Sequence, residues 1–185
     1  MWCERSLRTA GAVICMRVCL GGIAITLAPS HAIAQTPSKS PAPSAAIVTA
    51  IAEISLVHGN AEPFAAAGYR IGERALKEFK LTRGSFLLEV VHNTPEEVQW
   101  SCIADGVQAA TGASEGKLNL KVTVTKPGEV FTTIRDRRDG KTLVFRLTPQ
   151  FVAEYSNVLR DRFDAAGAEV LAMPDDRIFS MAPSQ

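Results

Sequence analysis

Hydrophobic residues recur along the chain with the periods that distinguish helices from strands. Ile47, Ile51 and Ile54 lie at helical spacing, which predicts a short amphipathic helix from about residue 45 that ends before His58. A second helix is predicted to begin at Pro63, because proline in the first turn lacks only an amide hydrogen that has no partner there. The small residues Ala66, Ala67 and Gly68 then allow this second helix to approach another backbone closely.

The next segment changes from the helical to the extended pattern and back. Ser85–Val91 is apolar on nearly both faces, as in a central strand that is buried on both sides. Thr94, Pro95 and Glu97 follow with the order of a capping box, in which Thr94 is the N-cap of a helix. This helix is predicted to end at Gly112.

Alternating residues dominate the rest of the chain. The first of three such segments places Leu118, Leu120, Val122 and Val124 on one face, and a last helix is predicted from Thr148-Pro149 to about Phe163. The predicted order is helix, helix, strand, helix, three strands and helix, which is an α+β layer sandwich. The three predicted strands are Lys117–Thr125, Glu129–Asp136 and Thr142–Thr148.

The N-terminal residues differ from this globular pattern. Arginines at positions 5, 8 and 17 precede the apolar run Val18–Ala28, and small residues at 32 and 34 suit a cleavage site before Gln35. These features predict a signal peptide over residues 1–34 and a periplasmic or secreted protein without a stable membrane span after cleavage. The alternative is an uncleaved anchor, although Arg17 interrupts a run that needs about 20 continuous apolar residues to span.

The predicted cleavage also defines what remains. Residues 35–44 are rich in proline and serine and are predicted to be a flexible linker, which leaves residues 45–185 as the folded domain. The chain has a formal net charge of +1, and no basic cluster dominates the sequence, which argues against a nucleic-acid partner. Phosphate-binding glycine loops and CxxCH are absent from the sequence of the predicted domain, so no nucleotide, flavin or haem motif is found there.

The candidate chemistry rests on few residues. After cleavage the chain keeps one cysteine, Cys102, and two histidines, His58 and His92. A single thiol cannot form an internal disulfide, so it is buried, paired between chains or used. Cys102 and Asp105 lie off the apolar stripe of their predicted helix. Together with the two histidines and Glu62, they lie at the ends of adjacent predicted elements, although no metal-ligand spacing such as CxxC is present. The alternative is structural: a free cysteine often acts as a small buried hydrophobe, and His58 would then be a loop or capping residue.

Two longer motifs resemble the FmdE family, which is named for a subunit encoded with molybdenum formylmethanofuran dehydrogenase. HGNAEPFAAAGYRIG begins at His58, and CIADGVQAATGASEGKLNL spans Cys102 to Leu120. They are similar to the family patterns HGHxCPGxxxGYR and CxxDxxQxxTGCTxGKGNL, and PDDRIFSM extends the likeness over roughly Ala45 to Met181. The resemblance implies a helix-strand-helix-three-strand core with a mixed sheet and commonly a homodimer, which the small residues of the second helix also favour.

The resemblance also implies a metal site, usually for zinc, but this sequence departs from the family's ligands. His58 matches the first histidine, whereas Asn60, Glu62 and Ala113 replace a histidine and two cysteines. A retained metal would therefore have a harder ligand set and bind weakly. The expected metal ligands are His58, Cys102, Glu62 and Asp105, with His92 in reserve, and the expected ligand-binding residues are Asn60, Tyr69, Gln108, Thr111 and Lys117.

Three functions are compatible with these residues. The favoured one is an exported binding module that holds a metal ion, with zinc the leading candidate, or a small ligand without catalysis. The second is a thiol- or metal-dependent enzyme in which His58 or His92 activates Cys102 as a nucleophile or redox thiol. The third is an accessory structural subunit with a degenerate site.

Overall fold

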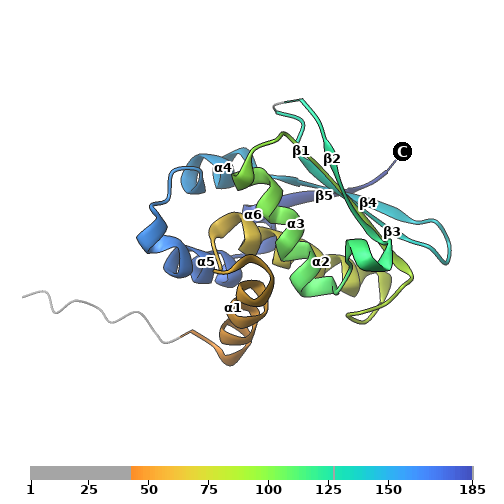
Figure 1. Ribbon diagram of the computed structural model, residues 1–185, viewed down its shortest axis with the longest axis horizontal. Coiled ribbons are helices and arrows are strands. Elements are labelled where there is room, and N and C mark those ends of the chain that lie inside the picture. Colours follow the sequence, from red (N-terminus) through yellow and green to blue (C-terminus); the bar gives the residue numbers. More distant parts are fainter. Residues whose placement is uncertain (1–42, 127, 185) are drawn as a thin grey trace, which may run out of the picture. The chain divides into compact units, whose positions relative to one another are not determined.

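The domain is an α+β fold in which helices cover one face of a five-stranded mixed sheet (Figure 1). The computed structural model describes residues 43–126 and 128–184. The predicted signal peptide and most of the predicted linker lie outside the described residues. In the part that is described, no helix is long and apolar enough to cross a membrane.

The described residues form six helices and five strands, in agreement with the predicted α+β class. The helices are α1 (Ala45–His58), α2 (Pro63–Phe79), α3 (Val98–Thr111), α4 (Pro149–Tyr155), α5 (Phe163–Ala172) and α6 (Asp175–Ile178). Two 3₁₀ turns are η1 (Glu115–Lys117) and η2 (Arg160–Arg162). The strands are β1 (Leu88–Thr94), β2 (Leu120–Val124), β3 (Phe131–Asp136), β4 (Thr142–Leu147) and β5 (Phe179–Pro183).

The sheet has the order β2-β1-β3-β4-β5, and only the β1–β2 pair is parallel. Val90 of β1 lies opposite Leu120 of β2 and Ile134 of β3, and all three side chains are buried. Alternate residues of β1 on this side are buried, whereas those on the other side are only half-buried. The prediction of a central strand buried on both sides is therefore wrong, because the helices pack against a single face of the sheet (Figure 1).

Small residues bring α2 and α3 into backbone contact. A Cβ atom built on Gly68 would lie 2.1 Å from the carbonyl oxygen of Ile103, and one built on Gly106 would lie 1.9 Å from that of Ala65. The predicted close approach of the second helix is thus made to α3 of the same chain. Because Ala66, Ala67 and Gly68 are buried inside the domain, they give no support to a homodimer, which stays a prediction from the family resemblance.

The start of α3 differs from the capping box that the sequence predicts. The N-cap is Glu97, whose side chain makes no capping hydrogen bond. Thr94 is instead the last residue of β1, where it pairs with Val124, and its hydroxyl donates to the Pro95 carbonyl at 3.1 Å. Pairing with β2 keeps Thr94 extended, so the helix can begin only after the turn.

The face predicted for β2 is confirmed for the residues inside the strand, because Leu120, Val122 and Val124 pair with the buried residues Val90, His92 and Thr94 of β1. Val122 and Val124 are nevertheless 45% and 62% exposed, since β2 is an edge strand with a neighbour on one side only. Leu118 precedes the strand in a left-handed conformation and is 78% exposed.

The C-terminal third is more complex than the predicted single helix. The helix that begins after Thr148 ends at Tyr155, and η2, α5, α6 and β5 follow. Phe151 of α4 stacks on Tyr155 and makes an edge contact with Phe64 of α2, which anchors this segment to the domain. β5 was not predicted, because its register is set by pairing with β4 rather than by a clear alternation of its own.

Candidate metal centre

The polar residues between α1 and α2 are gathered by the way one helix ends and the next begins. Gly59 adopts φ 97° and caps α1, which turns the chain directly after His58. Glu62 is the N-cap of α2, and its carboxylate accepts a hydrogen bond from the Ala65 amide at 2.8 Å. The helix then starts at Pro63, as predicted. This sequence of cap, turn and cap places an imidazole and a carboxylate at the same point of the fold.

The C-terminal part of the chain holds this turn in position. The amide of Ala61 donates to the Asp164 carboxylate at 3.2 Å. Gly167 of α5 lies so close that an added Cβ would be 1.7 Å from the Ala61 carbonyl oxygen. Sequence reasoning missed both residues, because nothing in the local pattern around Asp164 indicates a contact with a turn about a hundred residues earlier.

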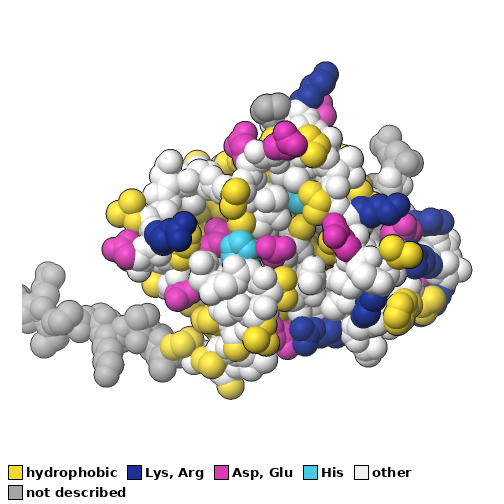
Figure 2. Space-filling view, viewed as in Figure 1, with side chains coloured by type: hydrophobic (Ala, Val, Ile, Leu, Met, Phe, Trp, Pro, Cys, Tyr) yellow, Lys and Arg dark blue, Asp and Glu magenta, His cyan; other side chains and the backbone are white. Residues whose placement is uncertain are grey.

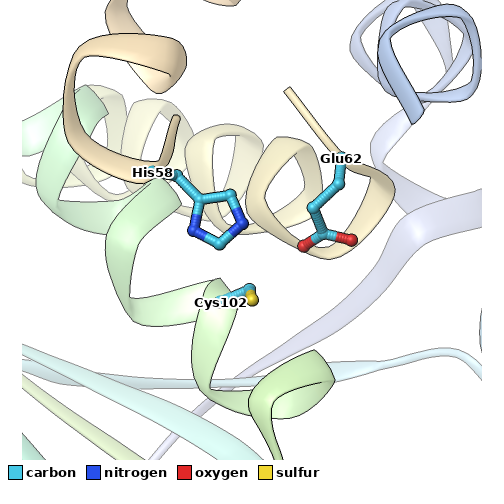
Figure 3. A group of neighbouring side chains, drawn as sticks. All are labelled: His58, Glu62 and Cys102. Atoms are coloured by element: carbon cyan, nitrogen blue, oxygen red, sulfur yellow. The ribbon is translucent and has the colours of Figure 1, made fainter. Parts of the chain in front are cut away.

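Cys102 completes a cluster with His58 and Glu62. One ligand atom from each of these three residues lies within 4.8 Å of the other two (Figure 3). Two ligands of one zinc ion, each about 2.0 to 2.3 Å from the metal, can be separated by at most about 5 Å. The three groups are therefore spaced closely enough to bind a single ion with little rearrangement.

Asp105 lies beside the cluster and orients the imidazole. Its carboxylate Oδ2 is 2.8 Å from His58 Nδ1. The ring nitrogen that faces Glu62 and Cys102 in Figure 3 is consequently Nε2. In metal sites, the ring nitrogen of histidine that does not bind the metal usually donates to a carboxylate or a carbonyl. This hydrogen bond fixes the orientation of the ring and makes the metal-binding nitrogen more basic. Asp105 thus contacts His58 and does not belong to the group of three residues whose ligand atoms lie together.

Burial and neighbouring charges perturb all three members of the cluster. The hydrogen bond that His58 donates to the Asp105 carboxylate raises the pKa of His58, and desolvation raises the pKa of Glu62. Burial, followed by the Glu62 and Asp105 charges, raises the pKa of Cys102 to about 12. The thiol donates to the Val98 carbonyl at 2.9 Å. Without an ion, Cys102 is thus a protonated thiol, whereas a bound cation would favour the thiolate.

His92 lies apart from these three residues. It sits within β1 with its side chain fully buried, and both ring nitrogens already have partners: Nδ1 lies 2.9 Å from the Thr132 hydroxyl and Nε2 lies 3.0 Å from the Trp100 carbonyl. Burial lowers the pKa of His92 to about 4. The structure therefore gives the reserve ligand a role in joining β1 to β3 and α3.

We expect His92 to make the domain less stable in mild acid. The unfolded state binds a proton near the ordinary histidine pKa of about 6.5, whereas the folded state binds one only near 4, so the free energy of unfolding falls as the pH drops between these values. The expected loss is about 3 kcal/mol at the acid end. Urea unfolding from pH 7 to 4 measures it, and His92→Gln should flatten that part of the profile; an unchanged slope in this variant would contradict the assignment.

The residues predicted to bind a small ligand differ in burial and in whether their polar atoms already have hydrogen-bond partners. The Tyr69 hydroxyl donates to Glu53 at 2.6 Å. Gln108 is half-buried on α3. Asn60 Oδ1 is buried and has no hydrogen-bond partner among the described residues, so of the predicted set it retains an unused acceptor.

Thr111 and Lys117 instead close the end of α3. The Thr111 hydroxyl donates to the Val107 carbonyl and accepts from the Ala113 amide. Lys117 Nζ donates to the carbonyls of Gly84 and Gly112 at 3.1 and 2.8 Å. These contacts give both residues a structural part at the end of α3, and their predicted role in binding a small ligand stays a prediction.

Comparison with known proteins agrees with the motif resemblance. Residues 57–180, more than half of the chain, match the model of the family described as FmdE, Molybdenum formylmethanofuran dehydrogenase operon. No curated protein matches the chain. The matched region includes His58, Glu62 and Cys102, so the cluster lies inside the family domain. The chain belongs to the FmdE family.

Proposed function

We propose that this protein is an exported binding module that holds one divalent metal ion, zinc in the first place, through His58, Glu62 and Cys102. The observation that carries the proposal is the convergence of the three ligand atoms within 4.8 Å. The proposed role requires no catalysis.

The types of ligand support zinc. Imidazole, thiolate and carboxylate together suit an ion of intermediate softness, and zinc accepts all three. Three protein ligands leave a fourth tetrahedral position for water or a small ligand. The buried oxygen of Asn60 would suit a hydrogen-bond donor in the region between α1 and α2.

The thiol-enzyme alternative is less well supported. The thiolate, not the thiol, is the nucleophile, and reactive cysteines lie in surroundings that lower the thiol pKa. The surroundings of Cys102 raise it to about 12, chiefly through burial. Cys102 is therefore better suited to serve as a metal ligand than as a free nucleophile.

Competition with a chromophoric chelator tests the binding function. Purified protein is stripped with chelator and then titrated with zinc in the presence of an indicator of known affinity. The proposal predicts saturation at one zinc per chain. Failure to compete with a weak indicator, for a protein that remains folded by circular dichroism, would reject it.

Zinc binding should strengthen as the pH rises. The Cys102 thiol must lose its proton on binding, so the association constant is expected to rise by about tenfold per pH unit from about pH 7 to 8. Below the raised pKa of His58 the imidazole must release a second proton, which makes the dependence steeper. Indicator titrations at four pH values measure the slope, and a pH-independent constant would show that the thiol is not a ligand.

Export and assembly are further parts of the proposal. The apolar run after Arg17 and the small residues at 32 and 34 support cleavage after Ala34 and a periplasmic or secreted location. Mass spectrometry of the recovered protein checks this, because retention of residues 1–34 would contradict it. A homodimer is proposed from the family resemblance.

A further inference from the structure

Three large apolar side chains are exposed to solvent at one end of the domain. Phe86 and Leu87 belong to the loop before β1, and Leu118 follows η1; they are 63%, 41% and 78% exposed. We refer to these three side chains as the apolar tip. A single exposed leucine is ordinary on a protein surface, but neighbouring large apolar residues mark an interaction site.

One arginine holds the two parts of the apolar tip together. The Arg137 guanidinium donates to the carbonyl oxygens of Phe86 and Leu118, at 3.2 and 3.3 Å. The Arg137 amide also donates to the Leu87 carbonyl at 2.8 Å. The two loops are therefore fixed side by side although they are separated by about thirty residues of sequence.

Hydrogen bonds also fix the backbone on both sides of the apolar tip. Leu118 has φ 55°, a left-handed conformation that is uncommon for residues other than glycine. The buried side chain of Asn119 donates to the Leu88 carbonyl at 2.9 Å and to that of Ser85 at 3.4 Å. The apolar tip is thus carried by two loops whose backbone is hydrogen-bonded to the rest of the domain.

Basic side chains lie beside the apolar tip. Lys117 Nζ lies 5.1 Å from the centre of the Phe86 ring, donates to the carbonyls of Gly84 and Gly112, and forms no ion pair with any residue described. The exposed residue Glu115 of η1 is the acidic neighbour of Lys117 in sequence. Arg135 and Arg137 share one carboxylate, that of Glu89, at 3.7 Å from each. Figure 2 shows hydrophobic side chains among Lys and Arg at the end of the domain that carries this loop and the β3–β4 turn.

We propose that this end of the domain docks on an anionic phospholipid surface. The apolar tip would enter the boundary between headgroups and acyl chains while the surrounding lysine and arginine side chains contact lipid phosphates. A second copy docked through the same surface would bring like charges together, which disfavours that occupant. The surface is formed by residues other than the metal cluster, so this inference does not depend on the proposed function.

Vesicle sedimentation tests the docking. Protein as recovered from an exporting host is mixed with vesicles of phosphatidylcholine alone or with one-quarter phosphatidylglycerol. We expect stronger partitioning to the anionic vesicles, weakened by high salt, and a loss of about tenfold or more in the double variant Phe86→Ser, Leu118→Ser. Leu56→Ser is the matched control, because Leu56 on α1 is 87% exposed and lies outside the apolar tip. Equal partitioning of wild type and double variant overturns the proposal.

A second measurement reads insertion at the apolar tip itself. Tryptophan is introduced in separate variants as Phe86→Trp and Leu56→Trp, and its fluorescence is followed with brominated phosphatidylglycerol in the vesicles. Both variants carry the same N-terminal residues, so any binding by those residues contributes equally. Much stronger quenching at position 86 is expected. Equal quenching at the two positions would overturn the proposal. Binding to an acidic peptide in a separate assay, without binding to vesicles, would also overturn it.

Discussion

Replacing Cys102 with serine is expected to weaken zinc binding by about 100-fold or more. The substitution removes the only sulfur ligand of the cluster, and the hydroxyl that replaces it is a poor ligand at neutral pH. Loss of an outer partner alone typically costs 10- to 100-fold in affinity, so loss of a ligand should exceed that range. Titration against an indicator measures the change, and circular dichroism verifies that the variant is folded.

Asp105→Ala provides the graded comparison. It removes the acceptor on His58 Nδ1 but leaves the three ligand atoms in place, so a smaller loss of about tenfold is expected. If Cys102→Ser bound zinc as well as the wild type while Asp105→Ala lost binding, the assignment of ligand and outer partner would be wrong.

Gly106→Ala is expected to destabilise the domain by about 3 kcal/mol. The added methyl group would lie 1.9 Å from the Ala65 carbonyl oxygen and 2.7 Å from the Tyr69 amide nitrogen, so α2 and α3 must separate. Overpacking of this kind typically costs 1–3 kcal/mol, and contact with backbone atoms leaves little room to relax. Urea unfolding measures the change in the free energy of unfolding.

Gly116→Ala is the matched control for this experiment. Its Cβ would meet no atom closer than the Ser114 hydroxyl at 3.9 Å, so the expected change is within about 0.5 kcal/mol. Equal stability of the two variants would show that the α2–α3 separation is not set by Gly106. The Ala65 amide donates to the Glu62 carboxylate, so separation of α2 and α3 should displace Glu62 and weaken metal binding as well.

Much of the N-terminal half of the domain follows from local sequence. Pro63 begins α2 and Gly112 ends α3 as predicted, because these signals depend on the residue's own backbone preferences. Thr94 misled the prediction, because its place in the β1–β2 ladder depends on a strand about thirty residues away. β5 was missed for the same reason, since β4 supplies its pairing.

In the candidate site too, the sequence identified some residues, whereas their contacts could be found only from the fold. The motifs identified His58 and Cys102 as candidates. Only the fold shows that Asp105 is hydrogen-bonded to the His58 imidazole and that Thr132 and Trp100 contact both ring nitrogens of His92. Short-range patterns cannot contain these distinctions, because they depend on where side chains of different elements meet. The support from Asp164 on α5 likewise required the three-dimensional structure.

X-ray absorption spectroscopy of the zinc-loaded protein reports the atoms bound to the ion. We expect one sulfur neighbour at about 2.3 Å, from Cys102, and nitrogen and oxygen neighbours at about 2.0 to 2.2 Å, from His58, Glu62 and a solvent molecule. The sulfur contribution should disappear in Cys102→Ser. A zinc spectrum of the wild type with nitrogen and oxygen neighbours alone would contradict the proposed centre.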